Sequence, residues 1–233
     1  TRTDFLTKLL DAFVDDTDLY DIVLDPNITT HTLAERMQQR AQFWEKSLFA
    51  TGGKLNFKKC YWYLIQWKWD EDGQPSLKTS TEAPADLALT YGGSSHSTTI
   101  CRKEPNEALK TLGFWSAPTG QQKTQLSETK TTLHHIAKNI HATPMTHLEG
   151  RLLIPVYLHS KLRYIFAATS FSKKECEQLD CIYRQPTIAK MGICRTTALY
   201  ILHSSYAYGG YQIPTSWDLQ GSIHLYYLLG HLQ

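Results

Sequence analysis

The 233-residue chain has no long hydrophobic run, because none reaches the roughly 18 apolar residues that a membrane-spanning helix requires. It also has no visible secretory signal peptide, internal repeat or low-complexity tract. Only five cysteines are present, at irregular spacings, which predicts reduced thiols rather than disulfides. We therefore expect an intracellular globular protein without a membrane partner, and the sequence does not distinguish nucleus from cytoplasm.

Two groups of possible metal ligands are weak on inspection. Cys176 and Cys181 are the closest cysteine pair, but no second pair matches them, so buried thiols are the simpler interpretation. Four histidines also lie near one another, at positions 134, 135, 141 and 147. His135 lies off the helix face that His134 and His141 share, and no acidic residue stands at zinc-ligand spacing. A partly exposed helical surface explains them without a metal.

Charge is unevenly distributed, although the formal net charge is only +2. The first fifty residues carry nine acidic and five basic residues, whereas the remainder carries 13 acidic and 19 basic ones. Residues 51–69 contain no acidic residue but four lysines: Lys54, Lys58, Lys59 and Lys68. An acidic start followed by a basic, aromatic body suits a protein that binds a metal at one end and a polyanion along the other. Ordinary variation in surface charge is the alternative.

The first part of the chain predicts a β-hairpin and a helix. Residues 9–14 and 19–24 have the composition of two strands, with Asp15 and Asp16 at their connection. Thr32 is predicted to cap a helix, with Glu35 at capping-box spacing, and Gly52–Gly53 to end it. The apolar residues of this helix share one face: Leu33, Met37, Ala41, Trp44 and Leu48.

The rest of the chain predicts short strands and then helices. A strand is expected at 61–69, a hairpin turn at Asp72–Gly73, and short strands at 87–91 and 98–102. Helices are expected at 121–141, 173–183 and 196–204, with an apolar segment at 148–168 that basic residues interrupt. The fold class is therefore α+β, with residues 1–69, a β connector at 70–117, and a mostly helical region at 118–233.

The Asp15–Asp16 pair suggests a chemical role. Adjacent side chains on a strand point to opposite faces, so two aspartates converge only where the backbone turns. Carboxylates are hard ligands that suit Mg²⁺, and two such ions about 3.5–4 Å apart assist phosphoryl transfer. Taken as a dipeptide alone, the pair is better explained by a solvated acidic turn, because Asp-Asp is a common pair.

Five segments in order resemble those of the reverse transcriptases of non-LTR retrotransposons. The first, Phe13-Val14-Asp15-Asp16 with Leu19 following, resembles the catalytic hairpin of that family. The others resemble its palm, thumb and later motifs: Gly52-Gly53-Lys54-Leu55-Asn56-Phe57-Lys58-Lys59, Leu112-Gly113-Phe114, Gly150-Arg151 with Leu153-Ile154-Pro155, and Gly209-Gly210-Tyr211-Gln212-Ile213-Pro214. Together they span most of the chain, from Leu10 to Pro214.

The resemblance implies the C-terminal part of a polymerase palm followed by a helical thumb-like domain. Asp15 would be the principal ligand of Mg²⁺, or of Mn²⁺, with Asp16 assisting, and Lys59 would lie near the incoming nucleotide. The partners would be an RNA template, a DNA primer and deoxynucleoside triphosphates. The residues expected to contact nucleic acid are Lys54, Lys58, Tyr61, Trp62, Arg151, Lys161 and Arg163. For the tryptophans and for Lys59, a structural role in the core or on the surface stays open.

The chain departs from that family in one important respect. The third catalytic aspartate and the fingers precede the hairpin in the family, and neither precedes Thr1 here. Asp11, Asp18 and Asp21 are poor substitutes because they belong to the same hairpin. We therefore expect an upstream segment of the same polypeptide to complete the site, and this segment alone to polymerise nothing. The alternative is a non-catalytic nucleic-acid-binding remnant of a decayed or truncated element.

Overall fold

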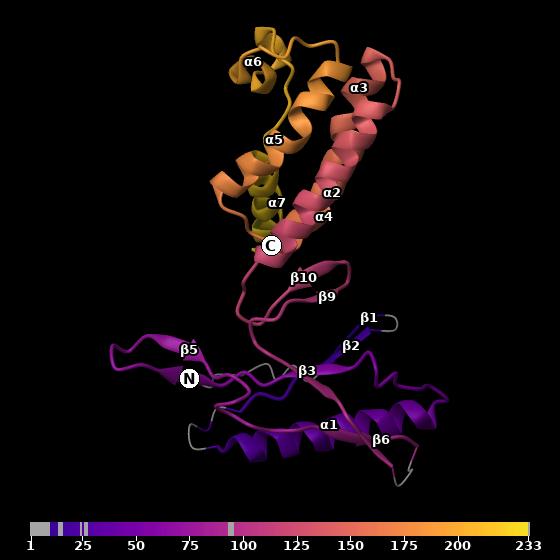
Figure 1. Cartoon of the computed structure of the whole chain (residues 1–233), viewed down its shortest axis with the longest axis vertical. Helices are drawn as coiled ribbons and strands as arrows, with labels where there is room; N and C mark the ends of the chain where they lie inside the picture. The colour runs from indigo at the N-terminus through magenta and orange to yellow at the C-terminus, as the bar shows by residue number, and fades with distance from the viewer. Residues whose placement is uncertain (1–9, 14–15, 24, 26–27, 93–95, 233) are drawn as a thin grey trace. The chain divides into compact units, whose positions relative to one another are not determined.

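The computed structural model describes residues 10–13, 16–23, 25, 28–92 and 96–232. The chain forms two compact units, the first ending at Glu107 and the second beginning at Ala108 (Figure 1). Both combine helix and strand, which confirms the α+β class in its coarse form. The predicted connector, 70–117, is divided between the two units. Within the described ranges, no helix is long and apolar enough to cross a membrane.

The first unit opens with an antiparallel hairpin of β1 (Leu10–Phe13) and β2 (Asp16–Leu19). Phe13 stands opposite Asp16, so two residues connect the strands. The second strand therefore precedes the predicted one at 19–24 and overlaps it only at Leu19. The connection between the strands is short, so β2 begins at Asp16. The prediction placed this strand later because the apolar residues follow Leu19.

Helix α1 (Thr30–Ala50) begins earlier than its sequence predicts. Its N-cap is Thr29, whose hydroxyl accepts a hydrogen bond from the Thr32 amide at 3.2 Å, so the prediction of Thr32 as cap is wrong. Several threonines in a row offer a cap here, and the earliest adds a further turn of hydrogen bonds to the helix. The predicted stop is confirmed, since Thr51 is the C-cap and Gly52 adopts φ +86°.

The core of the first unit lies between α1 and the strands that follow it. Ala34 and Ala41 of α1 are buried, and Leu33 and Met37 pack against them, much as the predicted apolar face requires. The remaining buried residues of this core come from the segments after α1: Trp62, Leu64, Ala83, Leu87, Leu89 and Ile100.

Short strands follow α1 and pair two by two. The parallel pair is β3 (Tyr61–Tyr63) with β8 (Cys101–Lys103). Two antiparallel pairs are β4 (Trp67–Trp69) with β5 (Pro75–Leu77), and β6 (Ala88–Thr90) with β7 (Ser97–Thr99). The predicted strand at 61–69 is thus divided, because its two ends pair with different partners. The predicted turn at Asp72–Gly73 connects β4 to β5, and Gly73 has φ +75°.

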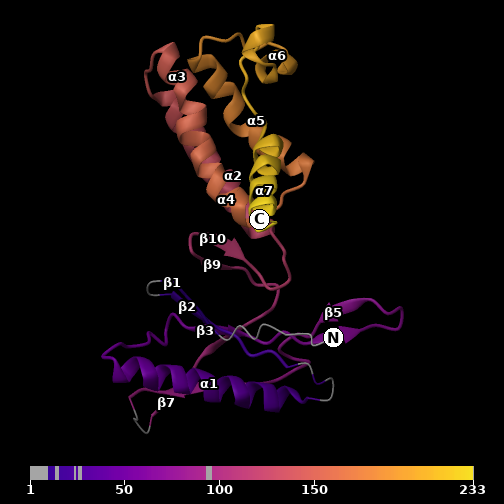
Figure 2. The ribbon, with the colours of Figure 1, turned by 180° about the vertical axis from the view of Figure 1, so that it is seen from behind.

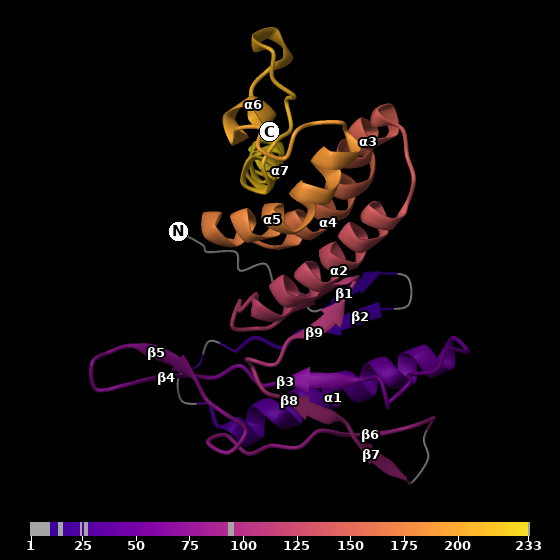
Figure 3. The ribbon, with the colours of Figure 1, turned by 45° about the horizontal axis from the view of Figure 1, so that its top comes forward.

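Side chains of α1 cover one edge of β6, and Figure 3 shows the helix alongside this strand. The hydrogen bonds join Gln38 to the amide of Ala88, Gln42 to both backbone groups of Thr90, and Glu45 to the amide of Gly92. Four residues of helix rise about 6 Å, which is close to the repeat of two strand residues. Glu45 is only 1% exposed, and its hydrogen bonds make the burial of this carboxylate tolerable.

The second unit begins with a tight hairpin of β9 (Leu109–Thr111) and β10 (Phe114–Ser116). Leu112 and Gly113 form its two-residue turn, with φ of +50° and +89°. A turn with two positive φ values matches the twist of the flanking strands, and glycine adopts such angles without strain. The Leu112-Gly113-Phe114 segment is therefore a hairpin tip followed by the first residue of a strand.

A bundle of helices forms the rest of the second unit (Figure 2). Helix α2 (Lys123–Ala142) packs along α5 (Lys173–Lys190), and α7 (Ser216–His231) packs on α4 (His159–Ala168). The amphipathic pattern predicted for 121–141 is confirmed, because Leu133, Ile136 and Ile140 are buried. Helix α5 continues seven residues beyond the predicted end at 183, through Pro186.

The apolar segment at 148–168 is a helical rod with one irregular turn. Helix α3 (His147–Leu153) begins with a capping box between Thr146 and Glu149, and a π-helical turn at Ile154–Leu158 leads into α4. Pro155 stands at the start of that turn, where its missing N–H is accommodated by the wider spacing of hydrogen bonds. The short helices α6 (Leu199–His203) and η2 (Tyr206–Tyr208) connect α5 to α7.

Candidate functional site

The predicted metal-binding pair lies at the connection between β1 and β2. Asp16 is the first residue of β2, whereas Asp15 lies outside the described residues. Phe13 of β1 stands opposite Asp16, so the second aspartate belongs to the strand itself. Adjacent carboxylates approach one ion only where the backbone departs from regular strand geometry. Two carboxylates match the hard oxygen donors that Mg²⁺ prefers, and water and nucleotide phosphates commonly supply the remaining donors.

Asp21 follows the hairpin, and two arginines contact one oxygen of its carboxylate. Its Oδ1 atom lies 3.2 Å from a guanidinium nitrogen of Arg36 and 3.2 Å from one of Arg40, and the side chain is 4% exposed. Arg40 also donates to the carbonyl of Tyr20 at 3.0 Å. These contacts attach the chain after β2 to α1, and they make Asp21 a structural anchor rather than a third metal ligand.

No group of three or more potential metal ligands occurs among the residues that the structure describes, which include the histidines at 134, 135, 141 and 147. Metal binding by Asp15 and Asp16 stays a prediction, since Asp15 lies outside the described residues.

The segment after α1 presents the predicted lysines to solvent. Lys54, Lys58 and Lys59 are exposed, and the Lys54 ammonium lies 4.7 Å from the centre of the Tyr91 ring. A turn in which the Lys59 amide donates to the Asn56 carbonyl at 2.9 Å holds the last two of these lysines. Three cations thus stand within six residues of one loop, as a site for a phosphate-bearing ligand requires.

Tyr61 and Trp62 point to opposite sides of β3. Tyr61 is 36% exposed and packs edge-on against Tyr63. Trp62 is 5% exposed, its indole N–H donates to the Ile100 carbonyl at 3.3 Å, and the Arg102 guanidinium lies over its ring. The indole belongs to the core and offers no face to a base, which corrects the expectation that Trp62 contacts nucleic acid. Strand alternation places only one of two neighbouring aromatics outside.

The predicted cations of the second unit are all exposed. Arg151 lies on α3, and Lys161 and Arg163 lie on α4. Exposed tyrosines accompany them on the same helical rod, since Tyr157 is 46% and Tyr164 54% exposed. Residues 108–233 carry twelve basic and six acidic residues, whereas residues 1–107 carry twelve and sixteen. The excess of positive charge therefore belongs to the second unit.

A buried polar cluster in the bundle was not predicted from sequence. Asp180 of α5 accepts hydrogen bonds from the Tyr183 hydroxyl at 2.7 Å and from the amide of Ser216 at 3.1 Å. The carboxylate therefore caps the start of α7, where the helix dipole favours a negative charge. Burial raises the pKa of Tyr183 and lowers the pKa of the nearby His159. The cluster holds α5 to α7, and no local motif announces it.

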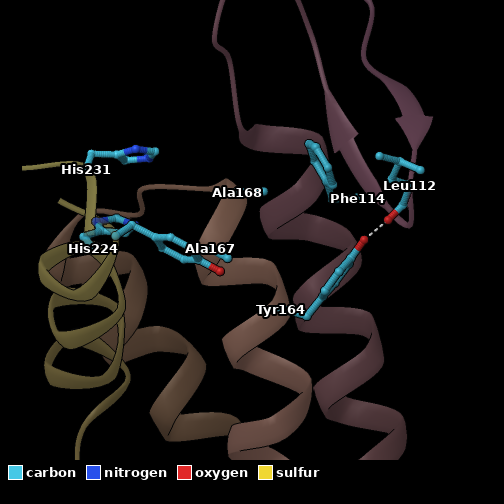
Figure 4. A pocket seen from close by; sticks show the side chains of 8 residues that line it. Leu112, Phe114, Tyr164, Ala167, Ala168, His224 and His231 are labelled. Atoms are coloured by element: carbon cyan, nitrogen blue, oxygen red, sulfur yellow. Dashed lines mark hydrogen bonds between the residues drawn. The ribbon is translucent and has the colours of Figure 1, made fainter. Parts of the chain in front are cut away.

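A pocket of about 480 Å³ lies within the second unit, among the β9–β10 hairpin, α4 and α7 (Figure 4). Its lining is largely aromatic and apolar: Leu112, Phe114, Tyr164, Ala167, Ala168, His224, Tyr227 and His231. The Tyr164 hydroxyl donates to the Leu112 carbonyl, and His224 Nε2 lies 2.9 Å from the Phe166 carbonyl. Because these residues come from three distant segments, the sequence alone gave no sign of the pocket.

Comparison of the chain with protein families, with curated proteins and with solved structures gives no match.

Proposed function

We propose that the chain is the C-terminal part of the palm and the thumb-like region of a retrotransposon RNA-directed DNA polymerase. The observation that supports this most is the β1–β2 hairpin, whose second strand begins at Asp16 of the aspartate pair. A long helix and an exposed lysine loop follow the hairpin, in the order that the resemblance requires. The proposal thus combines a hairpin that carries two acidic residues with a loop of cations suited to phosphates.

The site would act by nucleotidyl transfer onto a primer 3′-hydroxyl. Asp15 and Asp16 would hold Mg²⁺ or Mn²⁺, which stabilises the charge that develops on the reacting phosphate when it is bound. Lys59 is an exposed cation that can pair with the departing pyrophosphate. An upstream segment of the same polypeptide would supply the third carboxylate and the fingers, so this chain alone would copy no RNA template.

The second unit would hold the template–primer duplex by its phosphates. Its excess of basic residues provides the sequence-independent attraction that such a grip needs. Arg151, Lys161 and Arg163 are exposed on one continuous helical rod and are the residues we assign to this contact.

A second candidate is a non-catalytic nucleic-acid-binding remnant. The basic surface of the second unit is all that this candidate needs, because binding a duplex through its phosphates requires no metal site. This candidate keeps the duplex grip and loses the chemistry, so the two candidates differ in activity but not in binding.

Binding is tested with a fluorescently labelled RNA–DNA hybrid and the isolated chain, over a range of salt concentrations. We expect the triple variant Arg151→Ala, Lys161→Ala, Arg163→Ala to reduce the salt dependence by about 1 in slope for each lost phosphate contact. A control that removes three other exposed cations of the second unit should change the slope less: Lys123→Ala, Lys138→Ala and Lys173→Ala. Equal effects of both triple variants would refute the assigned surface.

Catalysis is tested by primer extension on an RNA template with the full-length protein. We expect Asp15→Asn to abolish extension while hybrid binding is unchanged. Extension that survives this substitution would remove Asp15 from the mechanism. A full-length protein that binds the hybrid but extends no primer would establish the non-catalytic candidate instead.

A further inference from the structure

The β4–β5 hairpin has one face that is entirely apolar and open to solvent. Trp67 stands opposite Leu77, and Trp69 opposite Pro75, so their four side chains share that face. Trp67 is 52% and Trp69 66% exposed. A two-stranded hairpin is marginal in water unless a further strand or a packed surface covers its apolar face. In Figures 1 and 3 this hairpin extends from the rest of the first unit.

The hydrogen-bond register leaves one edge of the hairpin open. The Lys78 amide donates to the Gln66 carbonyl at 2.8 Å, and the Asp70 amide donates to the Gln74 carbonyl at 3.1 Å. Alternation along an antiparallel pair then directs the backbone groups of the residues between, Trp67 and Trp69, away from β5. Among the described residues, β4 pairs only with β5, so this outer edge has no strand beside it.

The opposite edge of the hairpin is partly closed. By the same alternation, the outward groups of β5 belong to Pro75 and Leu77, and proline has no N–H to donate. A strand that joins the hairpin would therefore pair with β4 rather than with β5.

The charge beside the open edge is negative. The turn after Trp69 carries Glu71 and Asp72, whereas the carboxylate of Asp70 accepts a hydrogen bond from the Gln74 amide at 2.6 Å. The two nearby lysines do not offset them, because Lys68 and Lys78 occupy positions on the other face, where Lys68 pairs with Glu82. A nucleic acid would meet like charge here, whereas a cationic chain would meet both acidic groups and aromatic faces.

We propose that the hairpin binds an extended segment of another polypeptide that carries arginine or lysine at alternate positions. The segment pairs as a third strand with the open edge of β4 and lays its cationic side chains over the indoles of Trp67 and Trp69. Strand addition supplies affinity through the backbone, and the indoles and the acidic turn supply the preference for cations. This binding surface does not depend on the proposed polymerase function.

The probe is a short labelled peptide of alternating threonine and arginine, and its control has glutamate in place of arginine. We expect the arginine peptide to bind the whole chain and to slow amide hydrogen exchange at Trp67 and Trp69. Glutamate peptide that binds equally well, or exchange that stays unchanged at both tryptophans with the arginine peptide at saturation, would overturn the proposal.

Two sets of variants locate the binding. Trp67→Ala with Trp69→Ala should weaken the arginine peptide by at least about tenfold, as for other interface tryptophans. Tyr200→Ala with Tyr206→Ala is the matched control, because these residues are 72% and 68% exposed in the second unit. Equal loss in both pairs would contradict the assignment.

The charge variant Glu71→Gln with Asp72→Asn keeps both tryptophans and the hairpin bonds, so it tests the proposal even if the alanine pair disturbs the hairpin. It should weaken binding severalfold and flatten its salt dependence, whereas the exposed pair Asp86→Asn with Glu128→Gln should not. If the Glu71→Gln with Asp72→Asn variant bound the arginine peptide as tightly as the wild type, the cationic preference would be overturned. Labelled oligodeoxythymidine that binds wild type and is lost with the tryptophans would assign the face to nucleic acid instead.

Discussion

Gly150 lies where α3 meets the end of α5, and Gly150→Ala measures how closely the two helices pack. A Cβ atom at this position would lie 2.7 Å from the Lys190 carbonyl oxygen, 2.8 Å from its carbon and 3.0 Å from the Met191 nitrogen. All three are backbone atoms, so no side-chain rotation can relieve the contact. The helices must separate, or α3 must shift along α5.

The expected magnitude follows from two opposing terms. Replacing a helical glycine by alanine stabilises a helix by about 0.5–1 kcal/mol, because glycine loses more backbone freedom on folding. Forcing an extra methyl group into a packed interface costs about 1–3 kcal/mol. Gly221 of α7 supplies the control, since a Cβ there would meet nothing within 4 Å. The difference in unfolding free energy between the two variants therefore isolates the clash, at about 1–3 kcal/mol.

Urea unfolding followed by far-ultraviolet circular dichroism measures both free energies, because the second unit contains most of the helix. We expect Gly221→Ala to unfold at higher urea than the wild type, and Gly150→Ala at lower urea than Gly221→Ala. If the two alanine variants were equally stable, the close approach of α3 to α5 would be refuted.

Three further predictions concern the second unit. Burial lowers the pKa of His159 below its ordinary value of 6.5, so the unfolded chain binds the proton more readily than the folded chain does. The unfolding free energy should therefore fall as the pH drops through 6.5. Urea titrations above and below that pH should show a smaller fall for His159→Phe than for the wild type. Asp180→Ala should destabilise the unit by about 1–3 kcal/mol for each buried donor left unpaired, at Tyr183 and Ser216, and a normal urea midpoint would contradict its capping role. Leu112→Asn should raise stability by about 1 kcal/mol, since asparagine tolerates a φ of +50° better than leucine does; an unchanged thermal midpoint would show that this turn is not strained.

Sequence predicted the elements that local chemistry determines. The 3.6-residue apolar period of 121–141 defines which face of α2 is buried, and Asp72–Gly73 supplies a turn whose glycine adopts a positive φ. Gly52 likewise ends α1 because a left-handed residue is required there. In each case neighbouring residues carry the whole signal.

Features that depend on distant partners were not predictable in this way. Trp62 and Tyr61 are both aromatic, and only the pairing of β3 with β8 decides which of the two side chains is buried. Asp180 gave no signal because its partner, Ser216, lies 36 residues further along the chain. The prediction of the N-cap of α1 failed for a different reason, since Thr29 and Thr32 have the same side chain and either could cap a helix.

Sequence predicted the hairpin of the candidate site and the exposure of its lysines, but not the distribution of charge between the two units. The apolar residues around the aspartate pair predicted a hairpin there, although β2 begins at Asp16, within the pair, rather than at Leu19. Exposure of the lysines in the loop after α1 agrees with their polarity. The division of charge between the two units emerged only once the boundary after Glu107 was known.

The proline at position 75 has a consequence for self-association. A ribbon of strands grows without limit only when each newly added member exposes a fresh, complete set of donors and acceptors on its far side. Here a copy that docked through its own β4 would turn its proline-bearing border outward. Strand addition would stop at a dimer, so the hairpin can bind another strand without forming a fibril.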